Sequence, residues 1–341
     1  MATIKDVAKA SGYSVCTVSK ALSGKGYIKD STKEKILRVV DEIGYQPNHL
    51  AVSLKTGRTR AIALIVPDVM NVYFSRLQKY VDYYAGQFGY MVYLCNTNNS
   101  LEREKSYLRN LSEGRVDGVL ITPCTPEHGH IRKLKQIGIP YVYMNRYFAD
   151  EPEHCLPLNN EKGGYECVSY LAQKGFKRIG GIFQSFSNMS FPERFQGMKR
   201  ALKEAGLALD ESLCLFDMDD LDNAHEKIRT LLANPGRPEA LFAANDMLAL
   251  SVYQAAYECG LRIPDDLSVV GYDNSYLSDK VAPKLTSYYS PVRESAESAI
   301  RYLMAVLDER VPEKMSMLDG WLVEKGSVAE KAPLTDGEDT R

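Results

Sequence analysis

The sequence has little that would suit a secreted, membrane-bound or metal-binding protein. No stretch approaches the roughly 18 apolar residues that a membrane-spanning helix needs, and the N-terminus carries no apolar run of signal-peptide length. The seven cysteines are scattered, with no C-x-x-C pair and no His/Cys cluster at metal-ligand spacing. We therefore expect a cytoplasmic chain with reduced cysteines, no membrane association, no metal site and no cofactor.

Catalytic motifs are also missing. The sequence contains no phosphate-binding G-x-x-x-x-G-K-[ST] loop, no G-x-S-x-G nucleophile elbow and no H-E-x-x-H zinc motif. None of the five histidines stands in an obvious constellation with a nucleophile, and His128 and His130 fall in an expected surface loop or helix start. The sequence therefore argues against an enzyme.

The first 46 residues are organised as short helices. Thr3 and Asp6 form a capping box at the start of the first helix, and Ser14 can cap a second helix after a break at Gly12. Two helices joined by such a tight turn form a helix-turn-helix, whose second helix can enter a DNA major groove. The side chains expected to pack inward are Ile4, Val7 and Ala8 in the first helix and Val15, Val18, Ala21 and Leu22 in the second.

The outward side chains of the second helix are candidates for contacts with DNA bases. Lys20 can donate to guanine, Thr17 can bond a base or a phosphate, and Cys16 offers a small apolar contact to a thymine methyl group. The alternative is that these residues are solvated positions on a small helical domain.

Two further helices are expected in this region. Ser31 and Glu34 suggest a capping box at the start of a third helix, which stops at Gly44. Asn48 can then cap a helix of about two turns that ends at Gly57, and so short a helix is marginal alone. We expect this hinge helix to form when DNA and a partner chain hold it.

The charge of the chain is divided unevenly. Residues 1–60 contain eleven Lys and Arg against five Asp and Glu, whereas the remainder contains 31 against 39. The basic N-terminal region should therefore meet phosphate, with an affinity that falls as salt rises, while the acidic remainder avoids it.

From residue 61 onward, short apolar runs alternate with amphipathic stretches. Strands are expected at residues 61–66, 90–95, 117–122, 140–145, 178–183, 240–244 and 267–272. Helices are expected at residues 74–88, 101–113, 127–137, 161–174, 192–206, 221–233 and 246–259. This alternation favours parallel sheets covered on both faces, and its repetition before and after about residue 160 predicts two lobes.

Ligands of open α/β sheets bind beyond the carboxyl ends of the strands, and two lobes place that edge in a cleft. Arginines, amides and carboxylates near these ends can take hydroxyl groups, and aromatic rings can stack on a ligand ring. Alternatively, Arg194 and Asp273 form a structural ion pair, and Asn245 or Asp246 caps a helix. The residues just past the predicted strand ends include Asn71, Tyr73, Phe74, Arg146, Arg194, Asn245, Asp246 and Asp273.

Several motifs resemble the lactose-repressor (LacI/GalR) family of bacterial transcription regulators. They are MATIKDVAKASGYS, TVSKAL and GYQPNHLAVSLKTGRT near the N-terminus, and D-G-V-L-I, F-A-A-N-D and G-Y-D-N further on. The resemblance spans nearly the whole chain. It implies a small all-α helix-turn-helix headpiece with a hinge helix, joined to a two-lobed α/β body of doubly wound parallel sheets like that of periplasmic binding proteins.

The resemblance also implies the partners. A homodimer, or a tetramer, would place its headpieces on a palindromic operator in double-stranded DNA, and Leu54 would be a wedge that kinks the duplex. Family hinges commonly carry arginine where this chain has Val52, so hinge contacts could depend on Lys55. The DNA-binding candidates are Thr3, Ser14, Val15, Cys16, Thr17, Lys20, Leu54 and Lys55.

For the body, the resemblance implies an effector site. Sugar-responsive members often carry Asp where this chain has Asn145 and Asn160, so the cleft has lost negative charge. We expect a small-molecule effector that is a sugar, a sugar derivative or a nucleoside. The effector-binding candidates are Asn71, Tyr73, Phe74, Asn145, Arg146, Arg194, Asn245 and Asp273.

The expected domain limits follow from the same resemblance. A long helix near residues 291–309 should cross back to the first lobe, and the segment MLDGWLVEKGSV should return to the second. The expected domains are a headpiece (1–46), a hinge (47–60), an N-terminal lobe (61–160 and about 291–318), a C-terminal lobe (161–290 and about 319–330) and a loose tail (331–341).

Two binding proteins remain as alternatives to a regulator. A periplasmic transport protein has the same two-lobed body, but it would need a signal peptide and would not need a basic headpiece. A cytosolic sugar-binding module that lacks sequence-specific DNA readout is the other alternative.

Overall fold

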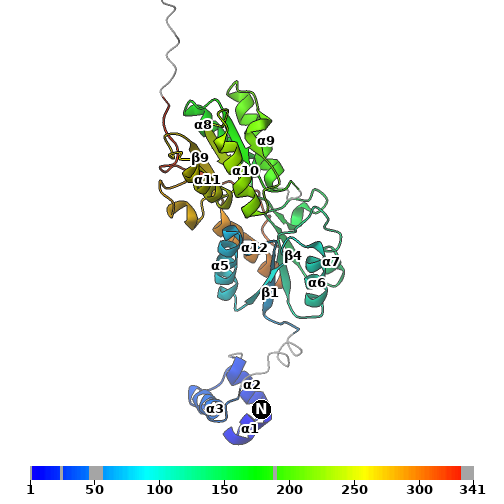
Figure 1. Ribbon diagram of the computed structural model, residues 1–341. Helices are drawn as coiled ribbons and strands as arrows, with labels where there is room; N and C mark the ends of the chain where they lie inside the picture. The colour runs from blue at the N-terminus through cyan, green and yellow to red at the C-terminus, as the bar shows by residue number, and fades with distance from the viewer. Residues whose placement is uncertain (1, 24–25, 46–56, 187–189, 332–341) are drawn as a thin grey trace, which may run out of the picture. The chain divides into compact units, whose positions relative to one another are not determined.

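The computed structural model describes residues 2–23, 26–45, 57–186 and 190–331 of the 341-residue chain. Its contacts divide the chain into two compact units, Met1–Thr59 and Arg60–Arg341. Figure 1 shows a small helical unit and a larger α/β unit, and each has hydrophobic cores of its own.

The first unit contains the predicted helix-turn-helix. The Thr3 hydroxyl accepts a hydrogen bond from the Asp6 N–H, and the Asp6 carboxylate accepts one from the Thr3 N–H at 2.8 Å, which completes the capping box. Gly12 ends the first helix in the left-handed region at φ 76°, where glycine is not strained. The helices are α1 (Ile4–Ser11), α2 (Val15–Ser23) and α3 (Asp30–Glu42), around a core of Val7, Val18, Ala21, Ile36 and Val39.

Two predictions for this unit were wrong. Helix α3 begins at Asp30, so Ser31 lies inside the helix and cannot be its N-cap; Lys29 is the N-cap and makes no side-chain capping bond. Asp30 instead places a carboxylate in the first turn, where it complements the helix dipole. Val15 is 42% exposed rather than packed inward, because the first residue of α2 extends beyond the core. The hinge helix, with Val52, Leu54 and Lys55, lies outside the described residues.

The first sheet of the larger unit has the strand order β2-β1-β3-β4-β5, with all neighbours parallel. Strand β1 is apolar and buried at every position, as expected for a central parallel strand. The strands are β1 (Ala61–Val66), β2 (Met91–Asn96), β3 (Gly118–Ile121), β4 (Tyr141–Met144) and β5 (Cys155–Leu156). Two helices cover each face (Figure 1): α5 (Val72–Gln87) with α12 (Val292–Leu307), and α6 (Leu101–Leu111) with α7 (Lys133–Gln136).

The second sheet has the order β11-β10-β9-β8-β6-β7, and only its edge strand β11 runs antiparallel to its neighbour among the described strands. Its strands are β6 (Ile179–Ile182), β7 (Cys214–Leu215), β8 (Ala240–Ala243), β9 (Ser268–Asp273), β10 (Thr286–Tyr289) and β11 (Trp321–Val323). Its faces are covered by α8 (Asn160–Gln173) with α9 (Ser190–Glu204), and by α10 (Leu221–Ala233) with α11 (Asp246–Glu258).

All seven predicted strands are present, and the two-lobed α/β fold is confirmed. Strands β5, β7, β10 and β11 were not predicted, and the helix expected at residues 127–137 is reduced to α7. Tertiary contacts explain this shortening. His128 stacks on Phe148 with ring centroids 3.9 Å apart, and His130 Nε2 lies 2.6 Å from a Glu104 carboxylate oxygen.

Two of the segments that connect the lobes lie beside each other, close to the start of α8. Leu158 and Leu318 form a parallel bridge, and the Leu318 N–H donates to the Pro157 carbonyl at 3.0 Å. Helix α12 follows a strand of the second sheet but packs into the core of the first. The lobes are therefore joined by connections that lie side by side.

Candidate functional site

The exposed start of α2 holds most of the DNA-binding candidates that the structure describes. Ser14 caps this helix: its hydroxyl oxygen accepts a hydrogen bond from the Thr17 N–H at 3.1 Å and lies 2.8 Å from the Thr17 hydroxyl oxygen. Val15, Cys16 and Lys20 are exposed on the same helix. The hydroxyl groups of Ser14 and Thr17 therefore fix the helix start, and their neighbours are left accessible from outside.

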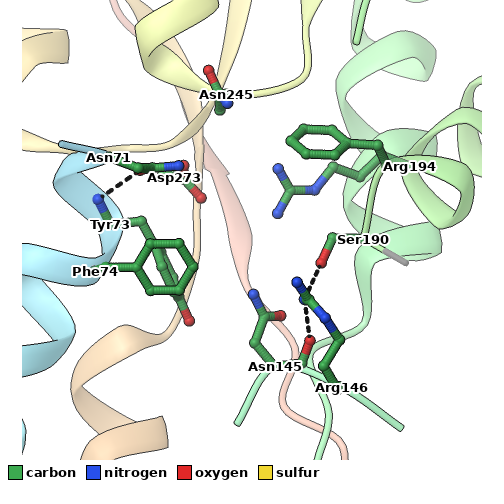
Figure 2. A pocket seen from close by; sticks show the side chains of 10 residues that line it. Asn71, Tyr73, Phe74, Asn145, Arg146, Ser190, Arg194, Asn245 and Asp273 are labelled. Atoms are coloured by element: carbon green, nitrogen blue, oxygen red, sulfur yellow. Dashed lines mark hydrogen bonds between the residues drawn. The ribbon is translucent and has the colours of Figure 1, made fainter. Parts of the chain in front are cut away.

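A cavity between the two lobes brings together all eight residues predicted to contact an effector. It contains about 310 Å³ of space not filled by atoms, including solvent space at its mouth. Figure 2 shows the side chains of Arg146 and Arg194 on one side and those of Tyr73, Phe74 and Asp273 on the other. The lining residues are Asn71, Tyr73, Phe74, Asn145, Arg146, Ser190, Phe191, Arg194, Asn245 and Asp273.

Ser190 and Phe191 are lining residues that the sequence analysis missed. They begin α9, which had been expected to start at residue 192. A helix that starts two residues earlier places them one turn before Arg194 and on the same face. This spacing is the signal that could have identified them.

Arg194 is only 4% exposed, and its side chain is held in place by several contacts. Its Nε donates to the Asn160 side-chain oxygen at 3.1 Å, its Nη1 donates to the Ala244 carbonyl, and its guanidinium carbon lies 3.6 Å from the Tyr272 ring centroid. Among the described residues it forms no ion pair within 4.0 Å, so the expected alternative of an ion pair with Asp273 is not observed.

Arg146 comes from the other lobe and is equally buried, at 4% exposure. Its Nη1 donates to the Asn145 carbonyl at 2.7 Å and to the Ser190 hydroxyl at 2.8 Å, so it joins the two lobes across the cavity. Burial lowers the pKa of Arg146 to about 10. The guanidinium group therefore remains charged at neutral pH.

Asp273 is held by its backbone and by one hydroxyl group. Its φ of 96° lies in the left-handed region, which is unfavourable for a residue with a Cβ and is typical of functional sites. Arg76 of α5 donates to the carbonyls of Asp273 and Asn274 at 3.3 and 2.9 Å, and Ser290 donates to the Asp273 carboxylate at 3.1 Å. Burial raises the pKa of Asp273, and the nearby Arg194 opposes that shift.

Two of the lining asparagines also cap helices. Asn71 accepts from the Tyr73 N–H at 3.0 Å, and Asn245 accepts from the Leu248 N–H at 2.8 Å, so each oxygen is oriented by a helix start. Asp246 is not the cap of α11. Its carboxylate accepts from the Ser275 N–H and the Ser287 hydroxyl at 2.6 Å each, and burial raises its pKa to about 7.

The first lobe leaves two polar atoms of the cavity without partners among the described residues. These are the Tyr73 hydroxyl and the Asn145 side-chain oxygen, both buried. Burial raises the pKa of Tyr73, so its hydroxyl keeps its proton and can donate as well as accept. Because buried polar groups are normally hydrogen-bonded, these two atoms are suited to a polar ligand.

Comparisons with known proteins identify the family. The model for bacterial regulatory proteins of the lacI family matches residues 3–48, and the periplasmic binding protein-like domain matches residues 168–328. The HTH-type transcriptional repressor PurR of Vibrio vulnificus (strain CMCP6) is 35% identical over 316 residues, covering 92% of this chain and 93% of the relative. The chain belongs to the LacI family.

A second relative agrees with this assignment, and a solved structure shows the same fold. The HTH-type transcriptional regulator DegA of Bacillus subtilis (strain 168) is 34% identical and covers 86% of this chain and 87% of its own length. The lac repressor dimer bound to operator and the anti-inducer ONPF has the same fold, with a TM-score of 0.83 and 23% identity, covering 96% of this chain and 99% of the other. This LacI-family chain is therefore a DNA-binding transcriptional regulator, and its relatives are regulators rather than enzymes.

Within the ranges given above, no helix is long and apolar enough to cross a membrane. No group of three or more His, Cys, Asp or Glu side chains among these residues could hold a metal ion.

Proposed function

We propose that this LacI-family regulator is a repressor that binds a palindromic operator as a dimer and responds to a small polyhydroxylated effector in the cavity between its lobes. The observation that carries the proposal is the convergence of ten side chains from two lobes on one cavity, in a chain whose N-terminal unit is a helix-turn-helix. Aromatic rings, amides and a carboxylate together suit a ring with hydroxyl groups.

Solved structures with ligands support a sugar or a sugar derivative. The transcriptional regulator CelR in a cellobiose complex is 26% identical, with a TM-score of 0.72, and covers 96% of this chain and all of its own. A LacI-family regulator from Enterococcus faecium with bound ribose is 25% identical and has a TM-score of 0.71. A nucleoside also combines a ring with hydroxyl groups, so it stays among the candidates.

The edge of the first sheet supports a dimer. Strand β2 is an edge strand, and its Met91, Tyr93 and Leu94 side chains are exposed. Exposed apolar edges promote association, so a soluble protein normally covers them. A second copy of the chain is the occupant that an operator with two equal halves would require.

The effector would act by changing the relation between the lobes. A ligand that contacts both Arg146 and Asp273 bridges residues of different lobes, so it favours one interlobe arrangement over another. If that arrangement holds the headpieces at a separation unsuited to DNA, effector binding and operator binding oppose each other by the same factor. Arg146 and Arg76 already link the lobes at this point.

Selection of DNA from random duplexes by the full-length protein tests the operator proposal. We expect enrichment of a palindrome with a pyrimidine-purine step at its centre, because such steps kink easily. If no sequence is enriched, with or without pools of small molecules, the protein lacks sequence readout and the proposal fails.

The hinge prediction has its own test. Leu54→Ala should weaken specific binding and reduce DNA bending, because the apolar wedge is removed, and Lys55→Ala should mainly reduce the salt dependence of binding. Gel-shift assays with circularly permuted operator fragments measure both affinity and bend angle. Unchanged affinity and bend in Leu54→Ala would exclude the wedge.

A further inference from the structure

The cavity contains two buried positive charges that have neutral partners. Arg146 and Arg194 are each only 4% exposed, and neither forms an ion pair within 4.0 Å among the described residues. Their hydrogen bonds go to the carbonyls of Asn145 and Ala244, the Ser190 hydroxyl and the Asn160 amide oxygen. A buried guanidinium group that is not directly paired with a carboxylate can gain a charge-assisted hydrogen bond from an anion, so this arrangement favours binding of an anion.

Each guanidinium group also has donors left over. A guanidinium carries five N–H groups, but the hydrogen bonds within the described part of the chain use only Nη1 of Arg146, and only Nε and Nη1 of Arg194. Figure 2 shows both groups pointing into the cavity. A planar fork of this kind matches the two oxygens of a carboxylate or phosphate.

Among the described residues, the acidic groups nearby form no ion pair within 4.0 Å with either guanidinium group. Burial raises the pKa of Asp273 and of Glu193, and the nearby arginines oppose that rise in both. Glu193 already accepts a hydrogen bond from the Asn160 amide at 2.9 Å, and Asp273 accepts one from Ser290 at 3.1 Å. The N–H groups of the two arginines that have no partner among the described residues are therefore left for a ligand on one side of the cavity.

The opposite side of the cavity suits a different part of a ligand. Asp273 and the Tyr73 hydroxyl can take hydroxyl groups, and Phe74 offers an aromatic ring. The ligand that fits both sides is polar and ring-sized at one end and negatively charged at the other.

We propose that the effector is an acidic compound, a sugar acid or a sugar phosphate, whose carboxylate or phosphate is bound by Arg146 and Arg194 while Asp273 takes its hydroxyl groups. This inference rests on the proposed effector site and narrows its ligand from a sugar in general to an anionic one.

Matched pairs of compounds test the proposal with the full-length protein. Isothermal titration calorimetry would compare D-glucose with D-glucuronate and with glucose 6-phosphate, D-galactose with D-galacturonate, and D-ribose with ribose 5-phosphate. At least one acidic compound should bind about tenfold or more tightly than its neutral partner, because charge-assisted hydrogen bonds are the stronger kind. The uronate pairs test a carboxylate as the charged group, and the sugar phosphate pairs test a phosphate. Neutral compounds that bind as tightly as their acidic partners would overturn the proposal.

Two variants of Arg146 show whether its guanidinium group produces any preference for the acidic compound. Arg146→Met should remove the preference for the acidic compound, and Arg146→Lys should keep part of it, because the charge remains but the fork is lost. Arg115→Met is the matched control, since Arg115 is an exposed residue paired with Glu113. A preference that survives in a folded Arg146→Met variant would overturn the proposal, and Arg146→Lys serves if the Met variant does not fold.

If no compound of the panel binds, inorganic phosphate serves as the anionic probe of the two arginines. We expect phosphate to raise the melting temperature of the wild type above that in chloride at equal ionic strength, and to do so less in Arg146→Lys. Equal stabilisation of both proteins would overturn the proposal. DNA selection is independent of these outcomes: a neutral sugar that binds and releases the selected operator would leave the proposed function intact and remove only the anionic effector.

Discussion

The two lobes of the body share an architecture, but they hold their cavity residues differently. In the C-terminal lobe, Arg194 has two hydrogen-bond acceptors and an aromatic ring beneath it, and Asp273 is held by Ser290. In the N-terminal lobe, the Tyr73 hydroxyl and the Asn145 side-chain oxygen have no partner among the described residues. The C-terminal half of the site is therefore largely prebuilt, whereas we expect a ligand to supply the missing partners of the N-terminal half.

The helix that carries Arg194 packs closely against its neighbour. Helices α8 and α9 approach so closely that a Cβ on Gly164 would collide with the Arg194 carbonyl, and one on Gly197 would collide with the Glu161 carbonyl. In contrast, a Cβ on Gly86 of α5 would meet nothing within 4 Å. The tight contact between α8 and α9 fixes the helix that carries Arg194.

Of the changes proposed here, removal of Arg194 from the prebuilt half should have the largest effect on effector binding. Arg194→Ala deletes a buried charged donor to a ligand, so we expect loss of about a hundredfold in effector affinity and loss of the effector response, with operator binding retained. Operator gel shifts with increasing effector measure both quantities. A normal response would show that the effector binds elsewhere.

A pair of glycine variants tests the packing difference. Gly197→Ala should destabilise the protein by about 1–3 kcal/mol, because the added methyl group meets backbone that cannot move aside. Gly86→Ala should be neutral or stabilising by up to about 1 kcal/mol, since alanine favours a helix and has open space there. Urea unfolding of both variants compares the free energies of unfolding. Similar values would show that the contact between α8 and α9 adapts to the added methyl group.

Much of the fold was predictable because periodicity is local. Strand β1 is a continuous apolar run, and the Thr3 capping box lies within four residues of sequence. Strands β5 and β7 have two residues each and leave no pattern. Strand β10 begins with two polar residues, Thr286 and Ser287. Both are buried, because the Thr286 hydroxyl accepts from the Lys325 N–H and the Ser287 hydroxyl donates to the Asp246 carboxylate. Helix α7 is short because contacts from distant residues hold His128 and His130.

The cavity was predictable for a topological reason. The carboxyl ends of parallel strands meet at one edge, so residues after β1, β4, β8 and β9 had to lie close together. The partners of those residues could not be predicted, because Asn160, Ala244 and Ser290 come from separate segments and their contacts depend on side-chain rotamers. The role of the cavity residues in effector binding stays a prediction, which Arg194→Ala and the matched ligand pairs will test.

The smallest expected effects come from two tyrosine hydroxyls, and they have opposite signs. In the C-terminal lobe, the Tyr288 hydroxyl accepts a hydrogen bond from the buried Gly320 N–H at 3.0 Å, so Tyr288→Phe leaves that donor unpaired and should cost about 1–2 kcal/mol of stability. In the N-terminal lobe, Tyr73→Phe deletes a buried hydroxyl without a partner among the described residues, so the free protein should become more stable by up to about 1 kcal/mol.

Effector binding distinguishes the roles of these hydroxyls. Tyr73→Phe should weaken effector affinity although it stabilises the free protein, because the deleted hydroxyl is one that a ligand would satisfy. Tyr288→Phe should leave effector affinity unchanged, since Tyr288 does not line the cavity. Urea midpoints give the stabilities and calorimetry gives the affinities. Destabilisation by Tyr73→Phe with unchanged affinity would mean that the Tyr73 hydroxyl is structural, and that the two halves of the site are equally prebuilt.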